Sequence, residues 1–240
     1  MKTKLTYLDD PYIKEMTAQI LDVIQEKEGV WKLILDQTVF YPMGGGQPTD
    51  QGTIQFPDGS KGEVYQVMLK DGEVYHYVKT TISPTPGMEV KGTIDWERRY
   101  KNMRVHSAGH VIDFSLYLLG YSPELLQPMK GDHGKKPFIL YQGVIEKNFK
   151  DELQQKTNEL IANAMNFSWK FDLLENIEKD ALYLQPGLPK NKPLRALKLE
   201  GVGIVADGGT IVASTKEVGT INITEIEIAE GNTYIKYLVV

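Results

Sequence analysis

The sequence contains no cysteine among its 240 residues. Disulfide bonds and thiolate chemistry are therefore excluded, and so is any zinc site that is built on sulfur. The sequence also lacks an excess of positive charge, since its formal net charge is −5. No overall electrostatic attraction to nucleic acid is expected, so any such contact must come from a local basic patch.

Long apolar runs are also missing. None approaches the roughly 20 residues that a membrane-spanning helix needs. The first ten residues, MKTKLTYLDD, hold two lysines with no apolar stretch after them, which argues against a signal peptide. We therefore expect a cytoplasmic protein without a membrane partner. A content of 41% hydrophobic and 25% charged residues is ordinary for a globular protein, and the length allows one large domain or two small ones.

The first part of the chain has the pattern of short strands separated by turns. Residues favourable to strands recur at 31–35, 63–67 and 73–78, with Asp58-Gly59 and Asp71-Gly72 as turn signals between them. Strands of this size and spacing predict a small β-barrel.

The pattern then changes to a helical period from Trp96 to Leu119, which Gly120 ends, and a second helix is expected from about Lys147 to Asn166. Strand character returns after Phe167. We predict an α+β fold, with a barrel domain at residues 1–92 and an α+β domain at residues 93–240 that has an antiparallel sheet and two main helices.

Three consecutive glycines, Gly44, Gly45 and Gly46, precede Gln47. Glycines adopt unusual φ angles and allow a ligand or another backbone to approach closely. No Gly-Lys-Ser/Thr follows, so this is not a phosphate loop. A wide turn within the barrel is the alternative interpretation.

Two of the four histidines, His106 and His110, are separated by four positions within the first predicted helix. This spacing places both imidazoles on one helical face, where they can share a metal ion. Gly109 lies between them and costs about 1 kcal/mol relative to alanine inside a helix, which indicates that something packs closely against this turn. Ordinary solvated or core histidines are the alternative.

Two further segments carry polar groups. Asp207 precedes Gly208 and Gly209 and could present a carboxylate to a cleft, or form an Asp-Gly turn between two strands. Basic residues surround an aromatic residue just before the histidine pair and could bind a phosphate backbone, or form a solvated helical face. These residues are Arg98, Arg99, Tyr100, Lys101 and Arg104.

In this order, the segments resemble the editing modules of alanyl-tRNA synthetase. Asp36 to Pro48 is similar to their glycine-rich motif, and Asp95 to His110 is similar to the helix that carries their paired histidines. Residues 207–212, Asp-Gly-Gly-Thr-Ile-Val, occupy the place of their Cys-Gly-Gly-Thr-His-Val motif. The resemblance extends from about Asp36 to the C-terminus and matches the free-standing AlaX-type proteins, which carry both a barrel and an editing domain.

The resemblance implies hydrolysis of the ester that joins serine or glycine to the 3′ end of alanine tRNA. In the family, two histidines, a cysteine and a further histidine hold zinc. Here the cysteine position is Asp207 and the last histidine position is Ile211. His106, His110 and Asp207 still form a catalytic type of zinc set with an open position. The alternative is a retained fold whose metal site has been lost.

The resemblance also suggests roles for the other residues. His106 and His110 would activate water or hold the polar groups of the substrate, with or without a metal. Gln47 and Thr210 would form hydrogen bonds to the aminoacyl group, which would lie beside Gly44, Gly45 and Gly46. Arg98, Arg99 and Lys101 would contact the tRNA.

Two other functions stay open at this point. One is a tRNA-binding module that has lost its metal and its hydrolytic activity, and the other is a hydrolase for a different small ester or amide. The sequence leaves the oligomeric state open.

Overall fold

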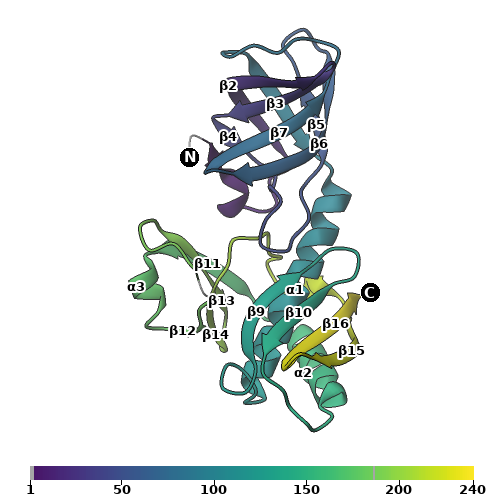
Figure 1. Cartoon of the computed structure of the whole chain (residues 1–240), viewed down its shortest axis with the longest axis vertical. Coiled ribbons are helices and arrows are strands. Elements are labelled where there is room, and N and C mark those ends of the chain that lie inside the picture. The colour runs from purple at the N-terminus through teal and green to yellow at the C-terminus, as the bar shows by residue number, and fades with distance from the viewer. Residues whose placement is uncertain (1–2, 186) are drawn as a thin grey trace. The chain divides into compact units, whose positions relative to one another are not determined.

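The computed structural model of the chain describes residues 3–185 and 187–240. The chain divides into two compact units, Met1–Asn102 and Met103–Val240, and the division falls within helix α1 (Trp96–Leu118). The first unit is a β-barrel and the second combines sheets and helices (Figure 1). The predicted α+β fold with an N-terminal barrel is confirmed. The predicted boundary after Gly92 lies before α1, and the assignment of an editing domain to residues 93–240 stays a prediction.

Six antiparallel strands form the closed barrel of the first unit, in the order β2-β3-β7-β6-β5-β8. Their bounds are β2 (Glu15–Lys27), β3 (Val30–Leu35), β5 (Gly52–Gln55), β6 (Lys61–Lys70), β7 (Glu73–Lys79) and β8 (Glu89–Ile94). Three short elements complete the unit, namely β1 (Lys4–Leu5), the 3-10 helix η1 (Thr6–Leu8) and β4 (Gln37–Thr38), and β1 pairs with β4 in parallel.

The barrel follows from the alternation of the strand sequences. In β8, every second side chain is buried, and β7 has the same period, so each strand sends one set of side chains inward. Valine, leucine, isoleucine and phenylalanine fill the interior. The predicted turns are confirmed at Gly59 and Gly72, whose φ angles of 85° and 77° are positive and are open to glycine without strain.

The imidazole of His76 is also buried completely in this unit. Its Nδ1 lies 3.1 Å from the carbonyl oxygen of Leu33, and its Nε2 lies 2.7 Å from Thr38 Oγ1. A carbonyl only accepts, so Nδ1 carries the proton and Nε2 accepts from the threonine hydroxyl. Burial lowers the pKa of His76 to about 4, so the imidazole is neutral at physiological pH.

We expect this histidine to make the protein less stable in acid. The unfolded chain binds a proton near pH 6.5 whereas folded His76 binds one only near pH 4, so stability is lost as the pH falls through this window. The full difference amounts to about 3 kcal/mol. Urea unfolding at pH 7, 5.5 and 4.5 measures it. In His76→Gln, whose amide can make the same two hydrogen bonds, the pH dependence should be weaker, and an identical dependence would contradict the assignment.

The second unit contains two four-stranded sheets and the main helices. The first sheet is antiparallel, in the order β15-β16-β10-β9, and the second has the order β11-β13-β14-β12, in which only the β12–β14 pair is parallel. The first sheet consists of β9 (Gln127–Asp132), β10 (Phe138–Gln142), β15 (Ile221–Ala229) and β16 (Asn232–Val239). The second consists of β11 (Phe167–Asp172), β12 (Ala181–Tyr183), β13 (Leu194–Leu199) and β14 (Gly203–Ala206).

Two main helices are present, as predicted: α1 ends at Leu118, and α2 spans Lys150–Ala162. A single turn, α3 (Leu174–Ile177), and the 3-10 helix η2 (Thr215–Val218) add to them. A turn at Glu230 and Gly231 joins β15 to β16 as a hairpin. The side chains of α1 between Met103 and Leu116 form much of the core of this unit. Within the described parts of the chain, no helix is long and apolar enough to cross a membrane.

Candidate active site

The middle of α1 carries the predicted histidine pair. His106 and His110 lie one turn apart, with ring centroids separated by 5.1 Å. Both residues are buried, with 4% and 8% of their surface exposed. Their spacing therefore has the predicted consequence, which is two imidazoles on one face of a helix.

The chain that leaves β14 brings a carboxylate to these two rings. Asp207 Oδ1 lies 3.3 Å from His106 Nε2 and 3.4 Å from His110 Nε2. The approach requires Gly209, since a Cβ atom at this position would lie 1.7 Å from Cε1 of His106. The backbone N–H of Gly209 also donates to Asp207 Oδ1, over 3.1 Å.

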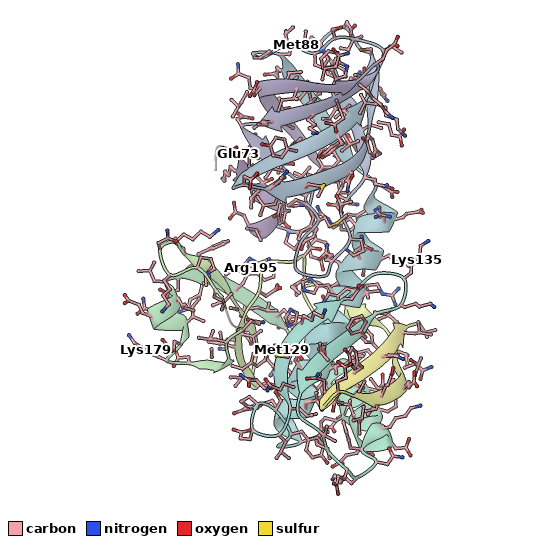
Figure 2. All side chains as sticks on the ribbon, in the orientation of Figure 1. Glu73, Met88, Met129, Lys135, Lys179 and Arg195 are labelled. Atoms are coloured by element: carbon pink, nitrogen blue, oxygen red, sulfur yellow. The ribbon has the colours of Figure 1, made fainter. Side chains whose placement is uncertain are left out.

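Arg195 lies on β13 (Figure 2). It fixes the orientation of this carboxylate. Arg195 Nη2 lies 2.5 Å from Asp207 Oδ2 and also donates to the carbonyl of Gly209. The guanidinium lies over the ring of Trp169, with Cζ 5.5 Å from the ring centroid. One oxygen of Asp207 is thus held by a buried cation while the other faces the imidazoles.

Two more buried polar residues support the histidines, and we did not predict either. The ring centroid of His133 lies 4.6 Å from that of His106, and His133 Nδ1 is hydrogen-bonded to the hydroxyl of Tyr237 over 2.7 Å. A Cβ atom at Gly109 would lie 2.6 Å from Cε1 of His133. The close packing that we predicted at Gly109 is therefore confirmed.

The other is Asp113, on the same helix. Its Oδ2 lies 3.8 Å from Nδ1 of His110 and accepts a hydrogen bond from the hydroxyl of Tyr183 over 3.0 Å. The hydroxyl of Tyr141 donates to its other oxygen. A carboxylate beyond the ring of a histidine orients that ring and favours a proton on the nearer nitrogen.

Burial and the neighbouring charges together determine the pKa values of Asp207, His106 and His110. Burial alone would raise the pKa of Asp207, but His106, Arg195 and His110 outweigh it and hold this pKa well below its usual value. Burial lowers the pKa of His106. Burial also disfavours the protonated form of His110, but the carboxylates of Asp207 and Asp113 outweigh burial and raise the pKa of that histidine. At neutral pH the cluster therefore offers an ionised carboxylate beside a neutral imidazole.

The three residues fit a metal ion of the zinc type. One donor atom from each of His106, His110 and Asp207 lies within 4.8 Å of the others. The two N–O distances, 3.3 and 3.4 Å, match the separation of about 3.3 Å between ligands that surround zinc tetrahedrally at about 2.0–2.1 Å. Among the described residues, neither ring nitrogen of His110 has a hydrogen-bond partner.

We expect Asp207→Ala to abolish zinc binding, because two imidazoles alone do not make a stable site. Titration of zinc against a competing chelator measures this. The matched control is Asp180→Ala, which removes an exposed carboxylate from the same unit and should leave the affinity unchanged. Equal zinc binding by all three proteins would show that Asp207 does not face a metal.

Arg195→Met should weaken zinc binding without removing a ligand. The variant removes the guanidinium that binds Asp207 Oδ2, so the carboxylate loses its fixed orientation. Loss of such a supporting group typically lowers metal affinity about 10- to 100-fold. The same chelator competition measures the zinc affinity of the variant. Arg195→Lys, which keeps a positive charge, should retain part of the affinity that Arg195→Met loses. An affinity equal to that of the wild type would assign Arg195 to folding alone.

The glycine-rich segment lies in the first unit. Gly45 and Gly46 have φ angles of 55° and 83°, so the predicted unusual backbone is present there. The Gln47 N–H donates to the carbonyl of Gly44 over 3.2 Å, and the Tyr41 hydroxyl donates to the same carbonyl over 2.7 Å. The roles of Gly44, Gly45, Gly46 and Gln47 in substrate binding stay predictions, as does that of buried Thr210 in the second unit.

The predicted basic cluster does not form one surface. Arg99 is completely buried and pairs with Asp50, and its guanidinium also donates to the carbonyls of Pro11 and Val39. The prediction that Arg99 contacts tRNA is therefore wrong. Its guanidinium forms a buried ion pair with Asp50 and cannot reach a phosphate. Arg98 is half-buried and donates to the carbonyl of Thr49, whereas Lys101 is exposed.

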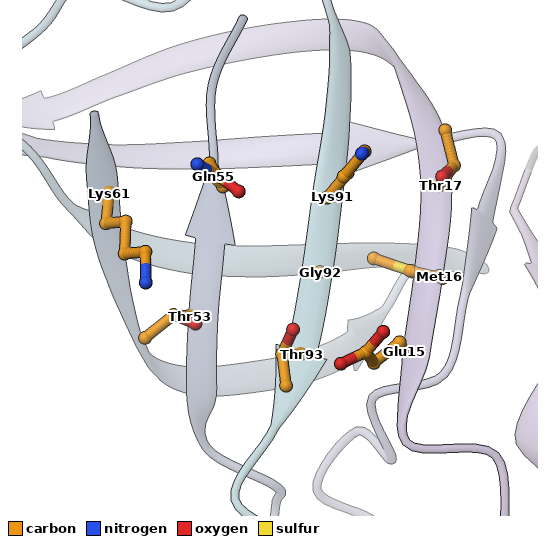
Figure 3. Close-up of a pocket in the computed structure, with 9 residues that line it drawn as sticks. All are labelled: Glu15, Met16, Thr17, Thr53, Gln55, Lys61, Lys91, Gly92 and Thr93. Atoms are coloured by element: carbon orange, nitrogen blue, oxygen red, sulfur yellow. The ribbon is translucent and has the colours of Figure 1, made fainter. Parts of the chain in front are cut away.

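A cavity of about 410 Å³ lies on the barrel, beside β2, β5 and β8 (Figure 3). Lysines, threonines and one glutamate dominate its lining, which contains no histidine. The residues that line it are Glu15, Met16, Thr17, Thr53, Gln55, Lys61, Lys91, Gly92 and Thr93.

Comparison with known proteins identifies the family that this chain resembles. Residues 9–98 match the family described as tRNA synthetases class II (A). The chain is 34% identical over 225 residues to "Alanyl-tRNA editing protein AlaX-L" of Pyrococcus horikoshii, which covers 90% of this chain and 53% of that protein. It is 32% identical over 235 residues to "Alanine--tRNA ligase" of Halobacterium salinarum, covering 94% of this chain and 25% of the ligase.

The chain belongs to the alanyl-tRNA synthetase editing-domain family, which includes the AlaX-type proteins. It is also 32% identical over 232 residues to the alanine–tRNA ligase of Pyrococcus abyssi, covering 94% of this chain and 24% of the ligase. The chain spans about half the length of AlaX-L and about a quarter of the length of these ligases.

Proposed function

We propose that the chain hydrolyses the ester of mischarged alanine tRNA and releases serine or glycine. The observation that carries this proposal is the approach of Asp207 to both histidines of α1, at 3.3 and 3.4 Å. The similarity to AlaX-L, which is named an alanyl-tRNA editing protein, supports the same reaction. Mischarged alanine tRNA is accordingly the proposed partner. Residence in the cytoplasm stays a prediction.

Each side chain has a distinct part in the proposed reaction. His106, His110 and Asp207 would hold a zinc ion, which when bound lowers the pKa of water and polarises an ester carbonyl. Arg195 keeps Asp207 ionised and oriented, and Asp113 orients His110. Neutral His106 can accept a proton from water if no ion is bound.

The remaining assignments rest on the family resemblance. We propose Gln47 and Thr210 as hydrogen-bonding partners of the aminoacyl group, together with the backbone of Gly44, Gly45 and Gly46. Arg98 and Lys101 are proposed to contact the tRNA. A site whose polar groups match a serine hydroxyl rejects alanine, because those groups would otherwise be buried without a partner.

Deacylation assays on alanine tRNA charged with serine, glycine or alanine test the proposal. We expect serine or glycine to be released at least about tenfold faster than alanine, in line with the discrimination that hydrogen-bonding sites achieve. Asp207→Ala should abolish this activity, and Asp180→Ala should retain it. Equal release of all three amino acids would contradict editing.

A second candidate is a tRNA-binding module without hydrolytic activity. The residue that favours it is Ile211, which is fully buried and cannot ligate a metal where the family motif has histidine. Binding of alanine tRNA without deacylation of any charged form would support this candidate. Hydrolysis of simple esters with no effect on charged tRNA would instead indicate a hydrolase for another small substrate.

A further inference from the structure

The edge strand β11 exposes apolar side chains near the histidine cluster. Alternate residues of a strand point to the same face, so Trp169 and Phe171 lie on one side of β11, and Leu173 follows directly after the strand. Phe171 is 45% exposed and Leu173 is 40% exposed, whereas Trp169 is half-buried. We call these three residues the β11 shelf.

Arg195 connects the β11 shelf to the candidate active site. It is the cross-strand partner of Phe171 in the β11–β13 pair, so the two side chains start on the same face as close neighbours. Its guanidinium lies over the ring of Trp169, and its Nη2 lies 2.5 Å from Asp207 Oδ2. Arg195 is therefore the cross-strand neighbour of Phe171 and at the same time binds Asp207.

We propose that the β11 shelf binds the unpaired nucleotides at the 3′ end of the tRNA, with a base stacked on Phe171. This inference rests on the proposed function. There, the ester to be cleaved is attached to the terminal ribose, so the terminal bases must lie close to Asp207. Aromatic side chains bind unpaired bases of any sequence by stacking on their faces.

The charge beside the shelf fits this occupant. Lys190 and Lys192 are exposed in the segment that leads into β13, and Leu194, the first residue of β13, pairs with Asp172 next to Phe171. The segment that carries these two lysines therefore joins the sheet at the end where Phe171 lies. A phosphate backbone next to stacked bases needs such groups, whereas an apolar protein partner does not.

A double-mutant cycle tests the proposal without using catalysis. The ligand is a fluorescent RNA hairpin with the acceptor stem of alanine tRNA, made either with its unpaired 3′ nucleotides or without them. Fluorescence anisotropy gives the affinities. For the wild type, removal of the unpaired nucleotides should weaken binding about tenfold, a loss typical of one stacked base. In Phe171→Ala the full hairpin should bind equally weakly, and removal of the nucleotides should cost little more.

Three further proteins separate stacking from other effects. Phe171→Tyr should bind like the wild type, and Phe171→Leu should bind like Phe171→Ala, because leucine keeps apolar surface but has no ring. Tyr117→Ala removes an aromatic residue of similar exposure, 38%, from the end of α1, and should change nothing. Circular dichroism checks that each variant folds.

Additive losses in the cycle would overturn the proposal, as would a Phe171→Leu protein that binds like the wild type. A change in sedimentation of Phe171→Ala with no change in RNA affinity would also overturn it and would make the shelf a protein interface. Failure of the proposed function has a different signature. The cycle would then show coupling between Phe171 and the unpaired nucleotides while no charged tRNA is deacylated.

Discussion

The contact between Arg195 and Asp207 determines what the rest of the candidate active site can do. A carboxylate buried without a cation is costly, and a carboxylate held at one oxygen only can turn. Arg195 supplies the cation and binds Oδ2, and the backbone N–H of Gly209 donates to Oδ1, so both problems are removed. Oδ1 is then left to face His106 and His110. The antiparallel pairing of β13 with β14 and the missing side chain of Gly209 are the structural conditions for this arrangement.

The same contact explains how aspartate can stand where the family motif has cysteine. A thiolate is a single donor atom, but a carboxylate has two oxygens, of which a metal ion in this geometry would use one. The second oxygen needs a partner of its own, and the guanidinium supplies it. With Ile211 at the last position of the motif, three protein donors remain. Three protein ligands with one open position is the arrangement of zinc sites that carry out hydrolysis.

Local patterns were sufficient to predict the barrel, both main helices, and the shared face of His106 and His110. They could not reveal His133, Asp113 or Arg195 as parts of the site. The partners of these residues are distant in sequence: His133 bonds to Tyr237 and Asp113 to Tyr183, and no periodicity links such pairs. Gly109 was the only local signal of His133, since it showed that a neighbour packs closely. Arg99 was misread because its partner, Asp50, is 49 positions away.

Both units use a buried arginine–aspartate pair to hold a glycine-rich segment, which has few side chains of its own to anchor it. In the first unit, Asp50 accepts from the backbone N–H of Tyr41, so it ties together the two ends of the loop that contains the three glycines. In the second, Arg195 binds the carbonyl of Gly209. Removing one member of such a pair leaves an uncompensated buried charge, at a cost of about 3–5 kcal/mol. The glycine segments therefore depend on these arginines, and neither guanidinium is free to serve as a surface contact for tRNA.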